Sequence, residues 1–456
     1  MIRNFKTQFF QCHISFLSNF ATKQFNTLKK VLIISYYWPP AGGISVLRTL
    51  KFAKYLNKFG WEPVIYAPKN ANYPYLDQEN FKDLPPNITV IRKRIIEPFG
   101  LFKLLTGRKK NDSSNPVYAK DKTSILDNLS IWIRGNFFIP DARYLWIKPS
   151  VRFLKKYLIK HPVDAILTDG PPHTNTVIGM QLSQKFHLPF LADFQDPWTQ
   201  VDYYKMMKIG KHADKKHHKL EQAVFKTAKK ITIASPTWAK DMESIGAKNV
   251  DVIYYGYDED DFKNINNKKN SNEFIIAHAG ILGMDRNPDI FFEALASIKK
   301  ENPEFAKQLK IKFAGIIDYS IKEHINMLNL NDNFEELGNI PRKDALQLMA
   351  FANLLLLPIN KADNARGRIP GKIYEYLRTY NPVLALGLKG SDVETILNNS
   401  KGGRLFTYDD FNGIKDYILK IFSNGFNYKI DKNYIKRFSS ENQTKQIAKY
   451  LDEITR

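Results

Sequence analysis

Short apolar runs alternate with segments of helical spacing along most of the chain. An apolar run at residues 31–35 leads into a turn with prolines and glycines at 39–43, and apolar residues then recur at helical spacing from Val46 to Leu56. A second apolar run follows at 63–67. Strand, turn, helix and strand in this order predict a βαβ unit and a parallel sheet. Further strands are predicted at 164–168, 189–193, 231–234 and 252–255, with helices at 176–186 and 237–245.

The alternation starts again after a polar stretch without apolar periodicity at residues 258–273. Strands are predicted at 274–279, 311–314, 354–357 and 383–386, and helices at 289–299, 321–328, 345–352, 373–378, 393–398, 411–422 and 430–454. The predicted fold class is therefore α/β, with two doubly wound, Rossmann-like halves facing a central cleft. The predicted divisions are an N-terminal extension (1–29), a first domain (30–257), a linker (258–273), a second domain (274–430) and a C-terminal helix (431–456). Residues 69–125, polar and broken by prolines, are predicted to be a surface insertion.

Polar loops that follow the predicted strands of the first half are candidate sites, because ligands of open α/β sheets bind beyond the carboxyl ends of strands. Carboxylates bind sugar hydroxyls, and an indole stacks on a pyranose face. The structural alternatives are a tight turn, a histidine satisfied by its surroundings, and an aspartate that caps a helix. The candidates in this half are Gly42, Gly43, His173, Asp193, Asp196 and Trp198.

The second half contains two glycine-containing loops with cationic side chains. One follows the strand at 274–279 and ends in arginine, and the other follows the strand at 354–357 and opens a helix. Free backbone N–H groups, arginine and lysine together favour an anion, and a carboxylate one turn into the helix can bind a ribose diol. The alternative is a solvated basic loop. The candidates are Gly280, Arg286, Arg368, Gly371, Lys372 and Glu375.

Composition narrows the classes of function. Lys and Arg outnumber Asp and Glu by 68 to 46, a net charge of +22, which predicts attraction to an anionic partner. The single cysteine, Cys12, excludes an intrachain disulfide and a cysteine-ligated metal site. No HExxH, P-loop or acidic pair after a strand is present, so neither a metal nor a cofactor is expected. The lysine patches come without an aromatic platform for RNA and without a helix-turn-helix, so nucleic acid is not expected as a partner.

Basic segments also predict a membrane surface as a partner. Residues 1–30 contain no acid and place phenylalanines on one side of a helix, and residues 101–125 and 205–230 are lysine-rich. The sequence contains no run of 18 apolar residues, so no membrane-spanning helix is predicted. The N-terminal stretch is either an interfacial anchor or a loose extension. The expected location is the cytoplasm, peripherally on the inner face of the cell membrane.

Six motifs in order give the chain a family resemblance over residues 30–430. They read SYYWPPAGGISVLRTLKFAKYLNKFGW, GPPHTN, ADFQDPW, YYGYDEDDF, HAGILGMDRNP and GRIPGKIYEYLRTYNPVLAL. Together they resemble the retaining glycosyltransferases of the GT-B fold, in the large "group 1" family four, and among them the members that build surface polysaccharides.

The resemblance implies a nucleotide sugar in the second half and an acceptor in the first. Gly42 and Gly43 would approach the donor phosphates, Arg286 would replace a phosphate-binding lysine, and Lys372 would meet the pyrophosphate. Glu375 would be the second glutamate of the family's pair. Gly280, Arg368 and Gly371 would belong to the same donor site, His173 and Asp196 would orient sugar and acceptor, and Asp193 and Trp198 would bind the acceptor. Such enzymes usually need no metal.

Four positions depart from the family pattern. Gly367 stands where the first glutamate belongs, and Ile281 stands where an arginine follows the donor-loop glycine. Gln195 replaces an arginine in the ADFQDPW loop, and Tyr255 replaces the asparagine of the crossing between domains. The expected function is transfer of a sugar with retention to a saccharide or a lipid-linked saccharide. The alternatives are a sugar-nucleotide epimerase of the same fold and a non-catalytic scaffold that binds sugar nucleotides.

Overall fold

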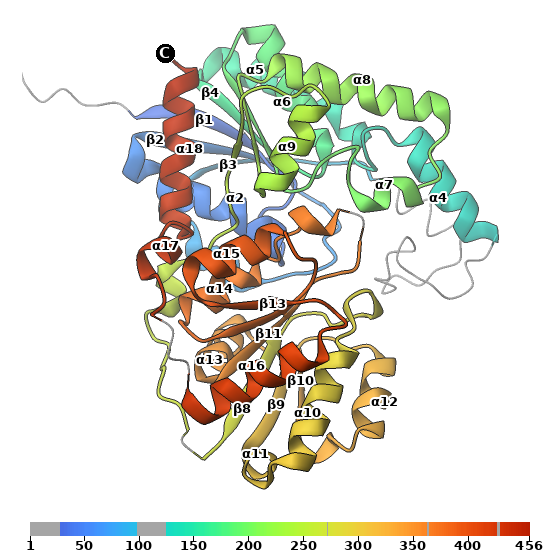
Figure 1. Ribbon diagram of the computed structural model, residues 1–456. Helices are drawn as coiled ribbons and strands as arrows, with labels where there is room; N and C mark the ends of the chain where they lie inside the picture. Colours follow the sequence, from blue (N-terminus) through green and yellow to red (C-terminus); the bar gives the residue numbers. More distant parts are fainter. Residues whose placement is uncertain (1–27, 98–124, 271, 363, 426–428) are drawn as a thin grey trace, which may run out of the picture.

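The computed structural model describes residues 28–97, 125–270, 272–362, 364–425 and 429–456. The N-terminal extension and most of the basic segment at 101–125 therefore lie outside the described residues. The chain folds into two α/β domains, one above the other in Figure 1. Each is built on one parallel sheet, so the predicted fold class is confirmed.

The upper sheet has seven strands in the order β3-β2-β1-β4-β5-β6-β7. Its central strands are buried from end to end, because helices cover both faces of the sheet. The strands are β1 (Lys29–Ile34), β2 (Trp61–Pro68), β3 (Thr89–Lys93), β4 (Ala165–Gly170), β5 (Phe190–Phe194), β6 (Lys230–Ile233) and β7 (Val250–Val252). The helices are α2 (Ile44–Tyr55), α4 (Ile125–Phe137), α5 (Ile147–Lys160), α6 (His173–Phe186), α7 (Asp202–Met206), α8 (Lys211–Thr227) and α9 (Pro236–Ser244).

The lower sheet has six strands in the order β10-β9-β8-β11-β12-β13. Apart from the extra edge strand above, this repeats the connectivity of the upper sheet. The strands are β8 (Phe274–Ala279), β9 (Leu309–Ala314), β10 (Phe334–Gly338), β11 (Leu354–Pro358), β12 (Val383–Leu386) and β13 (Gly403–Phe406). The helices are α10 (Asp289–Glu301), α11 (Pro303–Gln308), α12 (Tyr319–Met327), α13 (Arg342–Phe351), α14 (Lys372–Arg378), α15 (Asp392–Ser400) and α16 (Phe411–Asn424).

The C-terminal segment returns to the upper domain. The single helix predicted at 430–454 is instead two, α17 (Lys432–Lys436) and α18 (Ser440–Ile454), and the Ser439 hydroxyl caps the second by accepting from the backbone N–H of Asn442. Ile447 and Leu451 of α18 are fully buried in the same apolar cluster as Val31. Figure 1 shows this red helix beside the blue strands at the start of the chain. It therefore ties the last residues to the first domain.

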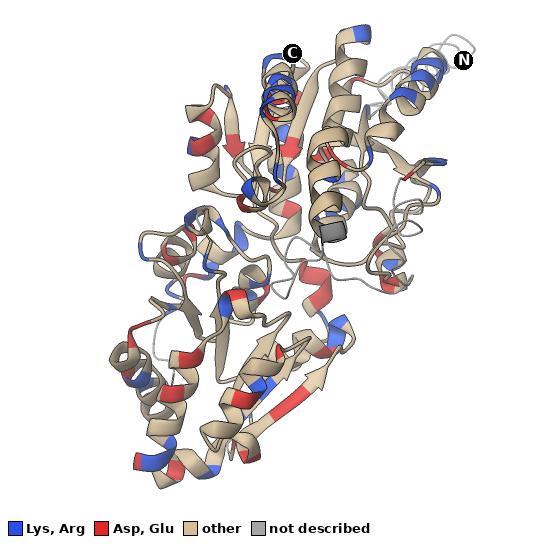
Figure 2. Cartoon of the chain, turned by 90° about the vertical axis from the view of Figure 1, so that its right-hand side faces the viewer, with Lys and Arg blue, Asp and Glu red and all other residues tan. Residues whose placement is uncertain are grey.

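The two domains are also joined by polar contacts. The backbone N–H and hydroxyl of Thr237 on α9 donate to the carboxylate of Asp392 on α15, at 3.0 and 2.9 Å. The indole N–H of Trp238 reaches the carbonyl of Asn364 at 3.4 Å. Among the described residues, no helix is long and apolar enough to cross a membrane. Basic and acidic residues are interspersed on both domains (Figure 2).

Candidate functional site

Both sheets contain a switch point, where the strand order reverses, and both switch points lie beneath predicted loops. In the upper sheet it lies between β1 and β4, whose loops contain the glycine turn and His173. In the lower sheet it lies between β8 and β11, whose loops contain Arg286 and Arg368. A crevice opens at such a point because neighbouring connections run to opposite faces of the sheet. The topology therefore brings the four loops to the facing edges of the two domains.

Lys372 is the central cation of the lower domain. Its ammonium lies directly over the Cα of Gly280, so closely that a β-carbon there would overlap it, and Gly280 adopts a φ of 135° that suits glycine. Burial, reinforced by repulsion from Arg286, lowers the pKa of Lys372 to about 8. The ammonium forms no hydrogen bond or ion pair with any residue that the structure describes. A half-buried charge without a partner favours an anionic ligand.

Arg286 and His278 complete the surroundings of this ammonium. Among the described residues, Arg286 is bound only by its neighbour Asp285, at 2.8 Å, and it remains partly exposed. His278 donates from Nδ1 to the carbonyl of Leu356 at 2.9 Å, so its Nε2 is an unprotonated acceptor, buried without a partner. Burial and the charge of Lys372 hold the pKa of His278 well below its usual value. Predicted Gly280, Arg286 and Lys372 therefore lie together, and His278 was missed because a histidine within a strand carries no pattern.

Glu375 has a different immediate partner from the one expected. Its carboxylate accepts from Arg342 of α13 at 2.7 Å, and Arg342 also binds Asp261 at 2.9 Å. The adjoining crevice has a volume of only about 20 Å³. Its lining includes Lys51 and Tyr255 of the upper domain. A ribose does not fit there unless the domains separate. The ribose contact expected of Glu375 is thus not preformed in this arrangement.

Arg368 connects the two domains. It forms an ion pair with Asp202 of α7 at 2.9 Å, while its Nε is buried without a hydrogen-bond partner. Asp196 faces the same guanidinium, which lowers its pKa, but burial is the larger effect and raises the pKa above its usual value. Asp196 forms no hydrogen bond within the described part of the chain. Its carboxylate therefore remains available to a ligand at the junction of the domains.

His173 and Trp198 form one aromatic unit on the upper side. Their rings stack with centroids 4.6 Å apart and an angle of 2° between the planes. Burial lowers the pKa of His173 to about 3, so the imidazole is neutral at physiological pH, and its Nδ1 has no partner. The indole N–H of Trp198 donates to Nδ1 of His217 at 3.1 Å. Both predicted residues line a cavity of about 240 Å³ in the upper domain.

Asp193 belongs to the interior of the upper domain rather than to an acceptor site. Arg48 binds it with two hydrogen bonds of 2.7 Å, and the hydroxyl of Thr232 donates at 2.6 Å. Asp193 is only 1% exposed, and both carboxylate oxygens are occupied. Arg48 also donates to the carbonyl of Ile253 at 2.7 Å. The acceptor contact predicted for Asp193 is therefore wrong, because the pair with Arg48 uses the carboxylate to hold α2 on the sheet.

The glycine turn of the upper domain meets the lower domain. Gly43 has a φ of 88° and precedes α2 without crowding, whereas a side chain at Gly42 would press on Asp77. The side chain of Ile44 covers Gly371, where a β-carbon would overlap it. Gly42, Gly43 and Gly371 thus lie on two loops in contact across the domains. Their closeness places the turn beside the start of α14.

No group of three or more His, Cys, Asp or Glu residues within the described ranges is arranged to hold a metal ion. The absence of a metal and of a cofactor stays a prediction. Two cations, Lys372 and Arg286, lie at the carboxyl ends of strands of the lower sheet, the carboxylate of Asp196 faces Arg368 at the junction of the domains, and the neutral imidazole of His173 lines the cavity of the upper domain. This combination can bind a diphosphate and orient hydroxyl groups.

Solved structures resemble the whole chain, whereas no family model and no curated protein matches the sequence. One is sucrose-phosphate synthase from Thermosynechococcus elongatus, at 16% identity over 93% of this chain and 98% of that one, with a TM-score of 0.58. The chain has the GT-B fold. Another is the lipopolysaccharide outer core galactosyltransferase WaaB, at 11% identity, 92% and 99% coverage and a TM-score of 0.54. A third is a putative UDP-N-acetylglucosamine 2-epimerase from Listeria monocytogenes. It is 9% identical over 92% of this chain and 95% of that one, with a TM-score of 0.52.

Proposed function

We propose that the chain is a glycosyltransferase that moves a sugar from a nucleotide-diphosphate sugar to a saccharide or lipid-linked saccharide acceptor, with retention. The observation that carries the proposal is the unpartnered ammonium of Lys372 over Gly280, with Arg286 beside it. Two such cations at the carboxyl ends of β8 and β11 suit the diphosphate of a donor. The GT-B fold and the six motifs support the same reading.

The residues of the cleft suggest how the reaction proceeds. As the bond from the sugar to the diphosphate breaks, negative charge grows on the leaving phosphate oxygens, and Lys372 and Arg286 are fixed where they stabilise it. A phosphate oxygen of the donor accepts the proton of the acceptor hydroxyl, so the new bond forms on the face that the diphosphate leaves. The protein then supplies no general base. Neutral His173 and the carboxylate of Asp196 orient the sugar and the acceptor by hydrogen bonds.

The biological setting proposed is synthesis of a surface polysaccharide at the inner face of the cell membrane. It is supported by the motif resemblance and by the likeness to WaaB, a lipopolysaccharide galactosyltransferase by name. The net charge of +22 is compatible with an anionic leaflet.

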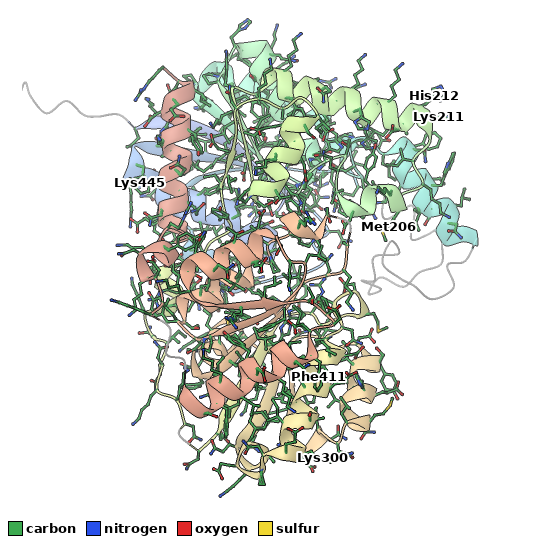
Figure 3. All side chains as sticks on the ribbon, in the orientation of Figure 1. Met206, Lys211, His212, Lys300, Phe411 and Lys445 are labelled. Carbon is green, nitrogen blue, oxygen red and sulfur yellow. The ribbon has the colours of Figure 1, made fainter. Side chains whose placement is uncertain are left out.

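Donor binding tests the proposal directly. The full-length protein is screened by thermal shift against UDP-, GDP-, dTDP- and CMP-sugars, and the best ligand is then incubated with candidate acceptors for product analysis. One donor should raise the melting temperature in wild type and in Lys300→Ala, an exposed lysine far from the cleft (Figure 3), and much less in Lys372→Ala. Equal stabilisation of Lys372→Ala would refute the donor site.

The epimerase alternative has a specific observation in its favour, because the Listeria epimerase shares the fold over most of both chains. An epimerase would convert the sugar of the donor without any acceptor. Incubation of the best donor alone, followed by analysis of the sugar nucleotide, separates the two functions: an unchanged sugar supports transfer, and a new epimer supports the alternative.

A further inference from the structure

The upper domain contains a cavity that the proposed donor chemistry does not use. It measures about 240 Å³, space for several water molecules of about 30 Å³ each, and lies among α4, α6, α7 and α8. Its wall is largely aromatic and includes Tyr37, Phe138, His173, Trp198, Tyr203 and Tyr204. A cavity of this size and lining accommodates part of a small polar molecule with an apolar face.

The cavity contains one uncompensated cation, Arg134 of α4. Its guanidinium lines the cavity and forms no hydrogen bond or ion pair with any residue the structure describes. Burial, and then repulsion from Arg143, lowers the pKa of Arg134 against smaller opposing effects that include attraction by Asp141. An arginine remains charged even so. The charge is therefore paired only when something else enters the cavity.

The charged neighbours of Arg134 are already occupied. Arg143 lies 3.5 Å from the carboxylate of Glu97 and stacks over the ring of Tyr36 at 4.6 Å. Asp141 accepts from the backbone N–H and the hydroxyl of Thr174, at 2.8 and 2.9 Å, at the start of α6. This carboxylate serves the helix and leaves Arg134 without an acid.

The other polar groups of the cavity wall include two histidines whose pKa burial lowers, His173 and His217, and the carboxylate of Asp141, which Thr174 already holds. His173 is 5% exposed and uncharged, and its Nδ1 has no partner. An imidazole in this state adds no repulsion toward an anion. Low polarity around Arg134 strengthens any charge-assisted hydrogen bond that it forms.

The cavity adjoins the cleft between the domains. Tyr203 and Tyr204 line it, and the preceding residue, Asp202, forms the ion pair with Arg368 of the lower domain at 2.9 Å. Trp198 also lines it, two residues after Asp196, which faces the same arginine. An acceptor seated here extends toward the place where the donor sugar is expected.

We infer that the acceptor carries an anionic group, a phosphate or a sugar carboxylate, that binds Arg134 inside this aromatic cavity. The inference rests on the proposed function, because it names the chemical class of that enzyme's acceptor. A neutral acceptor leaves the half-buried Arg134 without an ion pair, whereas an anionic one satisfies it with the geometry that guanidinium groups favour.

The test compares charged and neutral probes on the full chain. Glycerol 3-phosphate is compared with glycerol, and glucuronate with glucose, by calorimetry and by fluorescence. The measurements use a Lys372→Gln/Arg286→Gln background, in which phosphate has no donor cations to bind. The charged member of at least one pair should bind at least about tenfold more tightly, and Arg134→Gln should remove about tenfold or more of that affinity. The phosphate and carboxylate arms identify the source of the charge.

Two further variants keep the result decisive. Arg152→Gln removes an exposed arginine of α5 outside the cavity and should bind the probes like its parent. Arg134→Lys preserves the charge and should recover part of the affinity, which separates charge from folding. Equal binding of charged and neutral probes, or equal binding by Arg134→Gln and its parent, overturns the inference.

Donor binding distinguishes this result from failure of the proposed function. In the otherwise wild-type chain, Arg134→Gln should bind the nucleotide sugar normally and raise KM for an anionic acceptor at least about tenfold, with kcat little changed. Failure of every nucleotide sugar to bind wild type refutes the glycosyltransferase. A normal donor affinity together with charge-independent probe binding refutes only the anionic acceptor.

Discussion

The hydroxyl of Tyr255 donates a hydrogen bond to the side-chain oxygen of Gln195 at 3.1 Å. The amide nitrogen of Gln195 in turn donates to Asp169 at 2.5 Å and to the carbonyl of Ser45 at 3.2 Å. Gln195 and Tyr255 are two of the positions that depart from the family motifs, and they are partners in space. An arginine at 195 has no acceptor for the tyrosine hydroxyl, so the two departures are physically linked.

This link predicts a non-additive effect on stability. Tyr255→Phe leaves the Gln195 oxygen without its donor and should lower the free energy of unfolding by about 1 kcal/mol. In a Gln195→Leu background the same change should cost clearly less. Tyr75→Phe alters an exposed tyrosine and serves as the control. Denaturant unfolding of the four members of the cycle gives the coupling energy, and strict additivity would contradict the link.

Asp169 is expected to keep its proton in the folded state up to about pH 6. The Ser35 hydroxyl lies 3.0 Å from both the Tyr37 carbonyl and the Asp169 carboxylate, yet it has one hydrogen to donate. A protonated Asp169 donates to Ser35, and Ser35 then donates to the carbonyl, so both contacts are satisfied. Burial, followed by repulsion from Asp193, raises the pKa of Asp169 from 3.8 to about 6.

A raised carboxyl pKa makes stability fall as pH rises. Between pH 4 and 6 the unfolded state has lost this proton while the folded state keeps it, so deprotonation favours unfolding. Above pH 6 both states are ionised and no further loss follows. Asp169→Asn removes the titration, so its stability relative to wild type should rise by about 3 kcal/mol from pH 4 to 7. Chemical denaturation across this range measures the difference, and parallel curves for the two proteins would rule out the retained proton.

Lys372 predicts a pH dependence of donor binding. Its pKa of about 8 in the free protein means that the ammonium is lost above that pH unless an anion holds the proton. Affinity for the nucleotide sugar should therefore fall about tenfold from pH 7 to 9, with proton uptake on binding in the upper half of this range. Calorimetry in two buffers measures both quantities.

Substitution separates the two cations of the donor site. Arg286→Ala and Lys372→Ala should each weaken donor binding by about 1.5–3 kcal/mol, but only Lys372→Ala should also flatten the pH profile. Unchanged donor affinity in both variants would end the donor-site assignment.

The repeating pattern of strands and helices made the architecture predictable, because buried parallel strands are continuous apolar runs. β3, β10 and β13 were missed, because all three are edge strands with partly exposed residues that form no such run. The packing of α18 against the first domain could not be predicted either, because the sequence of an amphipathic helix does not indicate which surface it covers. Its partners became visible only in the packed structure.

Sequence reasoning could identify site residues that belong to a recognisable local motif. It could not identify those whose surroundings come from distant parts of the chain. Gly280 and Lys372 follow adjacent strands and lie together in the structure, and their role in a donor site stays a prediction. The absence of a glutamate at Gly367 has its reason in Trp238, whose indole covers Gly367 so closely that a β-carbon would overlap the ring. Arg134 was missed because nothing in α4 marks its lack of an acid, which depends on Asp141 and Glu97 being used elsewhere.

Chelation provides a prediction about the chemistry. Transfer activity should survive EDTA, because Lys372 and Arg286 supply the charge that a metal would provide, and the described residues offer no cluster of metal ligands. Initial rates with and without EDTA, after dialysis, measure this. Complete loss of activity, restored by Mg²⁺ or Mn²⁺, would reveal a metal site.

The last prediction concerns the membrane surface. The margin of the upper domain formed by α4, α7 and α8 combines exposed lysines with exposed apolar side chains, and Figure 3 labels Met206 and Lys211 on this same side of the domain. The lysines are Lys205, Lys208, Lys211, Lys215 and Lys216, and the apolar residues are Leu129, Trp132, Phe137 and Met206. Each lysine close to an anionic leaflet contributes about 1 kcal/mol, and inserted aromatic side chains add apolar burial. We therefore expect salt-sensitive binding to anionic vesicles.

Sedimentation with anionic and neutral vesicles at low and high salt measures this binding. Replacing the five lysines by glutamine should reduce it strongly, and deleting residues 1–28 should reduce it further if that acid-free stretch also binds. A matched control replaces five exposed lysines of the lower domain, Lys300, Lys307, Lys343, Lys389 and Lys401, and leaves the same net charge. If membrane binding follows total charge alone, both sets lower it equally and the margin is not a docking surface. If the full chain stays in the supernatant with anionic vesicles at low salt, the charge serves another anion, and the donor and the acceptor cavity are then its remaining candidates.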